Sequence, residues 1–199
     1  MHFDPEKHHR RSVRLEEYDY SRPGAYFVTV CVQDHTCLFG RVSGDKVDLS
    51  PQGQIVGECL RGIPVHSAGV QLDAFVVMPN HVHFIVVIQE PPVGATHASH
   101  DSVAAARTED KWATHASPLQ KSARGPEPVS LAAIVGAFKS ACTKRMRETF
   151  GGRAVKVWQR NYYEHVIRDN EEWNHIRQYV SDNPAKWAAD SENPSACPV

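Results

Sequence analysis

Two apolar, β-branched stretches, Val70–Met78 and His81–Ile88, are separated only by Pro79-Asn80. A proline and an asparagine between two β-rich runs predict a tight turn, so the stretches should form adjacent strands. Much of their length is continuously apolar, which is typical of central strands that are covered on both faces. This pair therefore requires a sheet with other elements packed against it.

The part of the chain before this pair contains two further predicted strands and one helix. The β-branched and aromatic run Tyr26–Gln33 predicts a strand, and Lys46–Leu49 predicts a shorter one that forms a hairpin with it. Ser50 followed by Pro51 is typical of a helix start, and the apolar residues that follow predict a helix ending near Gly62.

The part after the pair contains two predicted helices and two short strands. Apolar residues recur every three or four positions through Ser130–Thr149, which predicts a helix with one apolar face. Val155–Gln159 and Tyr163–Ile167 are short strand candidates, and a last helix is expected from a cap at Asp169 to a stop at Asn183. Strands and helices in this order predict an α+β sandwich built on an antiparallel sheet.

The segment 91–128 differs in kind from its surroundings. It contains few large apolar residues, and the pentapeptide ATHAS occurs in it twice, at 95–99 and 113–117. Such a segment cannot build a core, so we expect a flexible, low-complexity insertion rather than a histidine metal site. The predicted organisation is a basic N-terminal tail over 1–15, one domain over 16–190 interrupted by the insertion, and a C-terminal tail over 191–199.

The charge of the chain is balanced overall but uneven along its length. The 199 residues include 22 Lys and Arg and 23 Asp and Glu, a formal net charge of −1, which argues weakly against nucleic-acid binding. Between Gly136 and Arg160, however, seven basic residues stand against a single acidic one, Glu148. Such a stripe is typical either of a DNA-contacting surface or of a solvated helix face.

The longest uninterrupted apolar runs, Phe75–Met78 and Phe84–Ile88, are far shorter than the ~20 residues of a membrane-spanning helix. The opening residues MHFDPEKHHRR have no apolar stretch behind their charges, so they do not predict a secretory signal. We therefore expect a cytoplasmic protein that does not associate with a membrane.

His81 and His83 stand at the start of the second apolar strand. Alternate side chains of a strand point to one face, so both imidazoles share a face while Val82 points to the other. This spacing suits a divalent metal, but a chain with 12 histidines is expected to contain about one such pair by random placement. Burying two unpaired rings would cost ~1–3 kcal/mol each, so we expect both to have partners.

Tyr179 and Asn183 are four residues apart on the last predicted helix, so both can face the histidines. Pro184 disfavours helical dihedral angles at Asn183 and is expected to distort this spacing in the final turn. From the spacing alone, a core aromatic residue and a helix cap explain the two residues more simply than a shared site does.

Several separated motifs resemble those of the REP-associated tyrosine transposases, a branch of the HUH single-tyrosine transposases of insertion-sequence type. The motifs are VVMPNHVHFIVV, WQRNYYEHVIR and IRQYVSDNPAKW, and the opening stretch RRSVRLEEYDYSRPGAYFVTVCVQDHTCLFG is similar as well. The resemblance covers about Arg10 to Trp187 apart from 91–128, with the motifs in the same order. It implies a ferredoxin-like, RRM-like sandwich with a central antiparallel sheet flanked by helices, which agrees with the predicted element order.

The resemblance also implies roles for individual residues. His81 and His83 match the two metal-binding histidines of the HUH motif, and Tyr179 matches the nucleophilic tyrosine. Asn183 matches a further polar metal ligand, a position where some relatives of the wider family have glutamine. The implied cofactor is Mg²⁺ or Mn²⁺, and two histidines without a carboxylate suit Mn²⁺.

The implied activity is metal-dependent cleavage and strand transfer of single-stranded DNA. Tyr179 would attack a phosphodiester, giving a 5′-phosphotyrosine and a free 3′-hydroxyl, and a second 3′-hydroxyl would reverse the step without ATP. The implied partner is a single-stranded DNA hairpin from a repetitive extragenic palindrome, and the protein would be nucleoid-associated when bound to it. The sequence leaves open whether the chain acts as a monomer or as a homodimer.

Other residues are candidates for DNA contacts or for the nucleophile. The basic stripe and the possibility of base stacking predict DNA contacts at Lys139, Lys144, Arg145, Arg160, Tyr163, His165 and Arg168. Tyr162 and Tyr163 are the rival nucleophiles if the last helix is displaced. His175, four residues before Tyr179, is either a proton acceptor or an exposed helical histidine.

Two other functions stay open from the sequence. A domesticated DNA-binding protein would recognise the hairpin without cutting it. A metal-dependent hydrolase that uses activated water fits less well, because the sequence places no carboxylate as a base.

Overall fold

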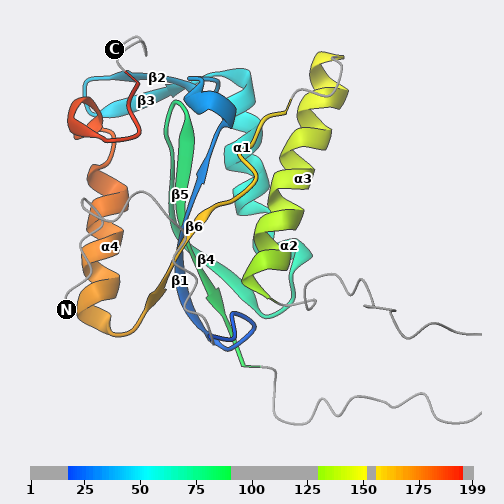
Figure 1. Cartoon of the computed structure of the whole chain (residues 1–199), viewed down its shortest axis with the longest axis vertical. Helices are drawn as coiled ribbons and strands as arrows, with labels where there is room; N and C mark the ends of the chain where they lie inside the picture. The colour runs from blue at the N-terminus through cyan, green and yellow to red at the C-terminus, as the bar shows by residue number, and fades with distance from the viewer. Residues whose placement is uncertain (1–17, 91–129, 152–155, 195–199) are drawn as a thin grey trace, which may run out of the picture.

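The main sheet has four antiparallel strands in the order β4-β5-β1-β6 (Figure 1). The computed structural model describes residues 18–90, 130–151 and 156–194. The strands are β1 (Gly24–Cys31), β4 (Val70–Val77), β5 (His81–Ile88) and β6 (Tyr163–Ile167). Helices α1 (Pro51–Arg61) and α3 (Leu131–Phe150) connect β1 to β4 and β5 to β6, which is the ferredoxin-like connectivity. The predicted α+β sandwich is confirmed.

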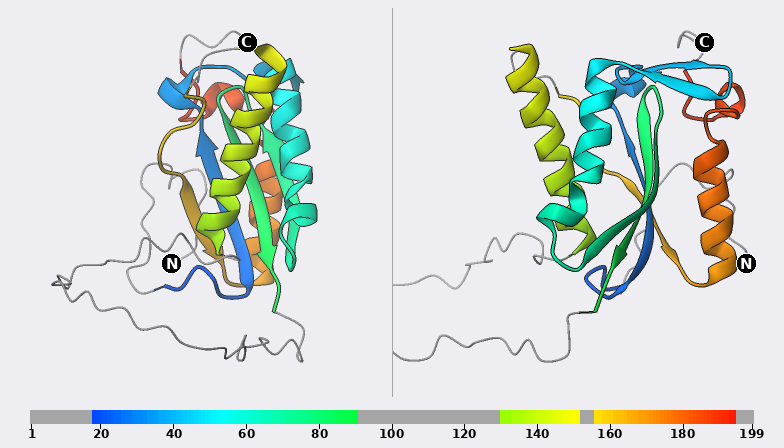
Figure 2. Two further views of the ribbon diagram at one scale, coloured as in Figure 1. Left: turned by 90° about the vertical axis from the view of Figure 1, so that its right-hand side faces the viewer. Right: turned by 180° about the vertical axis from the view of Figure 1, so that it is seen from behind.

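Helices cover both faces of the sheet. α1 and α3 lie on one face, and α4 (Asn170–Asp182) lies on the other (Figures 1 and 2). The core is divided in the same way, because neighbouring residues of a strand point to opposite faces. Val28 and Phe84 belong to the larger core beneath α1 and α3, whereas Phe27 and Ile85 belong to the core beneath α4.

The ends of the helices follow capping residues in the sequence. Ser50, Ser130 and Asp169 accept hydrogen bonds from backbone N–H groups in the first turns of α1, α3 and α4. Gly151 ends α3 with a φ of 62°, a left-handed conformation that glycine adopts without strain. All three predicted helices are thereby confirmed.

The predicted strand Lys46–Leu49 is present as β3, but its partner differs from the expected one. β3 pairs with β2 (Gly40–Ser43) and not with β1. β2 has only four residues, of which the first is glycine and the last is serine, so its composition does not predict a strand. The remaining short elements are η1 (Gln33–His35), α2 (Ile63–His66) and η2 (Trp187–Ala189).

Two further strand predictions are corrected. β4 is an edge strand of the main sheet, not a central one. It is apolar because both of its faces are covered, with Leu72 packed towards α1 and α3 and Val76 towards α4. The described part of Val155–Gln159 forms only an isolated bridge between Val32 and Trp158. Trp158 is buried, so the apolar residues here mark a loop that contacts the core.

The folded part of the chain extends past the domain boundary expected at residue 190. Glu192 is buried, and its carbonyl oxygen accepts a hydrogen bond of 2.6 Å from Asn80 Nδ2. The predicted N-terminal tail and the predicted insertion at 91–128 lie outside the described residues. Within the described ranges, no helix is both long and apolar enough to cross a bilayer.

Gly53 marks a close approach between α1 and the preceding chain. A Cβ at this position would overlap the carbonyl oxygen of Phe39, whereas a Cβ at Gly57 would meet only Arg61 Nη1, at 3.5 Å. We expect Gly53→Ala to lower the free energy of unfolding by about 2 kcal/mol. Gly57→Ala, the matched control, should stay within about 1 kcal/mol of the wild type. Chemical denaturation measures both, and equal stabilities would contradict this packing.

Candidate metal centre and nucleophile

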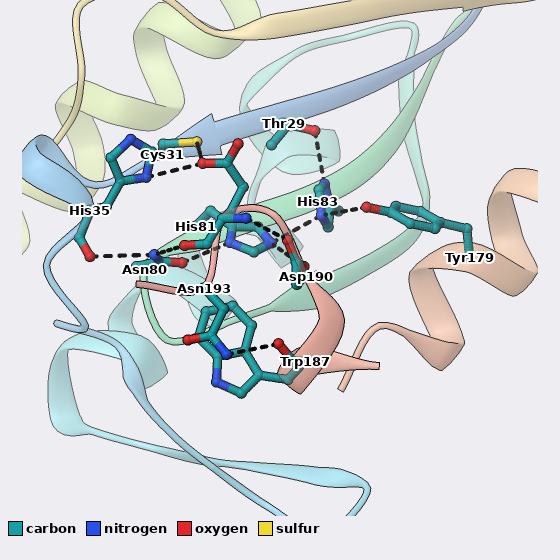
Figure 3. Close-up of polar contacts among 11 residues, drawn as sticks. Thr29, Cys31, His35, Asn80, His81, His83, Tyr179, Trp187, Asp190 and Asn193 are labelled. Carbon is teal, nitrogen blue, oxygen red and sulfur yellow. Dashed lines mark hydrogen bonds and ion pairs between the residues drawn. The ribbon is translucent and has the colours of Figure 1, made fainter. Parts of the chain in front are cut away.

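His81 and His83 occupy the first and third positions of β5 and point to the face covered by α4 (Figure 3). Their register partners on β1 are Cys31 and Thr29. Val82, between them, belongs to the core on the opposite face, as strand alternation predicts. Both imidazoles are buried, with residue exposures of 0% and 2%.

Hydrogen bonds behind each ring fix how the two histidines are turned. Asn80 Nδ2 donates to two backbone carbonyl oxygens, so Asn80 Oδ1 faces His81 Nδ1, at 2.8 Å, and accepts from it. A neutral His81 then carries its lone pair on Nε2. Thr29 Oγ1 lies 2.8 Å from His83 Nδ1 and restrains the orientation of that ring. Metal-binding histidines are commonly oriented by partners of this kind.

The Nε2 atoms of His81 and His83 lie 3.0 Å apart. Two nitrogen ligands, each ~2.1 Å from one ion and at right angles, would be ~3.0 Å apart. Two facing lone pairs at this distance repel each other unless a proton or a cation lies between them. The spacing of the pair therefore fits a shared metal ion.

Asp190 brings a carboxylate to the histidine pair. Its Oδ2 lies 3.9 Å from His81 Nε2, and its side chain is 5% exposed. Within the described part of the chain this buried oxygen has no hydrogen-bond partner, which costs free energy unless a proton or a cation matches it. Two imidazoles and a carboxylate suit a divalent metal such as Mn²⁺. The expectation that no carboxylate is placed at the site is corrected.

Tyr179 lies on the face of α4 that packs on the sheet. Ile176, Tyr179 and Val180 share this face because they are three and four residues apart, and Tyr179 is 7% exposed. The Tyr179 hydroxyl lies 3.4 Å from His83 Nε2, and its ring packs edge-on against Phe27 with centroids 6.0 Å apart. The structure thus brings the predicted nucleophile and the predicted histidines together.

Asp73 on β4 ties α4 to the sheet. Its carboxylate accepts hydrogen bonds from Trp173 Nε1 at 2.8 Å and from the Arg177 guanidinium at 2.7 and 2.5 Å. The hydrogen bond from Arg177 has the largest effect on the pKa of Asp73, which is held below its ordinary value. These contacts restrain the helix that carries Tyr179.

Asn183 follows α4 directly, one turn after Tyr179. Its φ of −54° and ψ of −42° are helical, so the distortion expected from Pro184 does not occur. A proline only biases the preceding residue, and a hydrogen bond from Lys186 N to Asp182 O continues the turn. The Asn183 side chain is buried, and its Oδ1 has no hydrogen-bond partner among the described residues. Asn183 stays a predicted metal ligand.

Asp190→Asn tests whether this carboxylate binds a metal. The substitution keeps the shape of the side chain and removes its charge, so Mn²⁺ affinity should fall by more than about tenfold. Asp182→Asn is the matched control, because Asp182 is half-buried at the end of α4 and accepts from Gln178. Titration calorimetry with Mn²⁺ measures both. An unchanged affinity in Asp190→Asn would remove Asp190 from the ligand set, and Asn183→Ala tests Asn183 in the same way.

Lys139, a predicted DNA contact, has a structural role. Its Nζ donates to the carbonyl oxygens of Gln159 at 3.0 Å and Asn161 at 2.9 Å, and it lies over the Tyr162 ring. Burial lowers the pKa of Lys139 to about 8. The side chain holds the segment before β6 against α3.

The other predicted basic contacts lie on the surface. Lys144 and Arg145 are exposed on α3, where they pair with Glu148 and Glu58. Arg160 and Arg168 are also exposed, before and after β6. Exposed ion pairs are weak, so Lys144 and Arg145 can exchange their partners for phosphates at little cost.

Tyr163 and His165 lie on β6. Burial, followed by the charges of Glu164 and Glu172, raises the pKa of Tyr163 above its ordinary value, which disfavours it as a nucleophile. His165 Nε2 lies 2.9 Å from Glu172 Oε1, and Glu172 Oε2 accepts from the backbone N–H of Arg168. These contacts join β6 to the start of α4. His175 is exposed on α4.

The chain is similar to proteins that are already known. It is 35% identical over 187 residues to an uncharacterized protein of Haemophilus influenzae, and the match covers 92% of each chain. Among solved structures, it is similar to a REP-associated tyrosine transposase bound to a REP hairpin, with a TM-score of 0.51 and 18% identity. That match covers 86% of this chain and 74% of the other, and it shows a shared fold. No protein-family model matches the chain.

Proposed function

Because the chain belongs to the family of the uncharacterized Haemophilus influenzae protein and has a transposase fold, we propose that it cleaves and rejoins single-stranded DNA. The proposed reaction is metal-dependent and passes through a 5′-phosphotyrosine on Tyr179. One observation carries this proposal: the Tyr179 hydroxyl is 3.4 Å from His83 Nε2, which is itself 3.0 Å from His81 Nε2. A nucleophile for a phosphodiester needs a group beside it that neutralises negative charge.

His81, His83, Asp190 and Asn183 are the residues that would hold the ion, Mg²⁺ or Mn²⁺. When bound, a divalent ion supplies positive charge that polarises the scissile phosphate and stabilises the transition state. The buried, unpaired oxygens of Asp190 and Asn183 support this assignment. Two imidazoles among the donors favour Mn²⁺ over Mg²⁺, which prefers oxygen ligands.

In the proposed step, Tyr179 Oη attacks the phosphorus, and the bond from phosphorus to the 3′ oxygen breaks. The tyrosine loses its proton and the leaving 3′ oxygen gains one, so the step is balanced without a co-reactant. The new tyrosine–phosphate bond keeps the energy of the phosphodiester, so a second 3′-hydroxyl can attack it and rejoin a strand. His83 and Phe27 hold the phenol in place for the attack.

The proposed substrate is a DNA hairpin with an unpaired flank. The solved REP-associated transposase is bound to a REP hairpin, and we extend this ligand class to the present chain. The candidate phosphate contacts are the exposed side chains of Lys144, Arg145, Arg160 and Arg168, and Tyr163 is the candidate for base stacking. Gel filtration with and without the hairpin would separate a monomer from a homodimer.

Formation of a covalent adduct tests the proposal. The protein is incubated with Mn²⁺ and hairpins from the repeats of its own genome, labelled at the 3′ end so that the label stays on the strand joined to tyrosine. We expect labelled protein on a denaturing gel with Mn²⁺ and none with a chelator. Hairpin binding without an adduct or a nick would overturn the proposal in favour of a DNA-binding protein that does not cut.

A further inference from the structure

Cys31, His35 and Glu192 form a second group of metal-ligand side chains beside the first (Figure 3). Their donor atoms all lie within 4.8 Å of one another. Glu192 Oε2 lies 3.0 Å from His35 Nδ1 and 3.7 Å from Cys31 Sγ. We propose that these side chains bind a zinc-type cation, separate from the ion at His81 and His83. This inference is independent of the proposed function.

Two of the three distances between the ligand atoms can be compared directly with tetrahedral coordination, and both suit it. A zinc ion bound at ~2.3 Å from sulfur and ~2.0 Å from nitrogen and oxygen would place nitrogen and oxygen ~3.3 Å apart, and sulfur and oxygen ~3.5 Å apart. The observed separations, 3.0 Å and 3.7 Å, differ from these by only a few tenths of an ångström. A thiolate and a carboxylate would also neutralise the double charge of the ion, with the thiol proton released on binding.

The fold brings the three ligands together from separate segments. Cys31 ends β1, His35 ends η1, and Glu192 follows η2. Asp34 and His35 have φ values of 57° and 52°, a left-handed conformation that is costly for residues with a Cβ. The surrounding contacts hold this conformation, which turns the His35 imidazole back towards Glu192.

The surroundings supply the outer contacts of a metal site. Gln159 Nε2 lies 2.9 Å from His35 Nε2, on the side of the ring away from Glu192. Turning the Gln159 amide would let its oxygen accept from Nε2–H and free the lone pair on Nδ1, as a bound metal requires. The His35 side chain is 42% exposed, which leaves room for water as a fourth ligand.

Contacts link this site to the histidine pair. Asn80 Nδ2 donates to the Glu192 carbonyl oxygen at 2.6 Å, while Asn80 Oδ1 accepts from His81 Nδ1. The Glu192 backbone N–H donates to Asp190 Oδ1 at 2.8 Å. An ion on Glu192 would therefore fix both the turn that presents Asp190 and the amide that orients His81. We assign it a structural role.

Cobalt absorption tests the site, because Co²⁺ takes the place of zinc and bonds to thiolate give a charge-transfer band in the near ultraviolet. The full chain is stripped of metal under reducing conditions and titrated with Co²⁺ alone. The wild type should show the band, and Cys31→Ser should lose it. Glu192→Gln, which keeps the sulfur, should need more than about tenfold more Co²⁺ to reach the same absorbance.

Matched variants distinguish this site from other cysteines and from the histidine pair. Cys59→Ser removes another partly buried free thiol and should keep the band. His83→Ala should also keep it, whether or not the protein cleaves DNA. Absence of the band in the wild type would overturn the proposal, and Cys31, His35 and Glu192 would then form a hydrogen-bonded cluster without a metal. Loss of the band in Cys59→Ser or His83→Ala would also overturn it. Near-ultraviolet circular dichroism shows whether metal-free Cys31→Ser is folded. If Cys31→Ser is unfolded, the Co²⁺ titration of Glu192→Gln tests the proposal in its place.

Discussion

Tyr179→Phe should lose covalent adduct formation and slow strand cleavage by about a thousandfold or more, while hairpin binding stays within about twofold of the wild type. The substitution removes only the hydroxyl that lies 3.4 Å from His83 Nε2. The phenyl ring keeps its packing against Phe27, so the fold and the position of α4 are retained. Single-turnover cleavage and a binding titration, both in Mn²⁺, measure the two effects.

Tyr163→Phe is the matched control for this experiment. Tyr163 also packs near Phe27, with ring centroids 6.4 Å apart, but burial raises its pKa. Cleavage should persist in Tyr163→Phe. Loss of the adduct in Tyr163→Phe and its survival in Tyr179→Phe would reverse the assignment. Cleavage without any adduct in Tyr179→Phe would instead support hydrolysis by activated water, for which Asp190 offers a base.

His83→Ala should lower Mn²⁺-dependent cleavage by about a thousandfold or more, because it removes both a predicted ligand and the partner of the nucleophile. The His83 ring is buried and contacts Thr29, His81 and Tyr179, so its removal breaks all three contacts. Cleavage rates over a Mn²⁺ titration give both the maximal rate and the metal dependence. Chelation should abolish wild-type cleavage, and added Mn²⁺ should restore it.

His66→Ala is the control for the loss of a histidine. His66 is exposed at the end of α2, and α2 lies on the side of the sheet opposite α4 (Figure 1). Its removal should leave both cleavage and Mn²⁺ affinity unchanged. Full activity in His83→Ala would contradict the proposed centre, whereas reduced activity in both variants would point to a general effect on folding.

The positions of the residues at the centre of the candidate site could be predicted, because these residues obey local rules. Strand alternation places His81 and His83 on one face, and helical spacing places Tyr179 on the sheet side of α4. The same periodicity predicts the three long helices. It says less about pairing, so the partner of β3 and the edge position of β4 were predicted wrongly.

The carboxylates of both candidate metal sites were not predictable from the sequence. Asp190 and Glu192 lie in an irregular segment with neither strand nor helix periodicity. Tertiary contacts hold this part of the chain against the sheet. One of them is the packing of Trp187 against His81, with ring centroids 6.0 Å apart. Such contacts depend on the whole fold, so no local sequence pattern predicts them.

The candidate site lies at the start of β5, whereas the connection from β5 to α3 begins at the other end of the strand. His81 begins the strand and Ile88 ends it, so its two ends lie ~23 Å apart at ~3.3 Å per residue. The connection to α3 leaves from the far end, and α3 begins beside Tyr20, just before β1. Insertions and deletions between β5 and α3 would therefore be tolerated without moving the histidines.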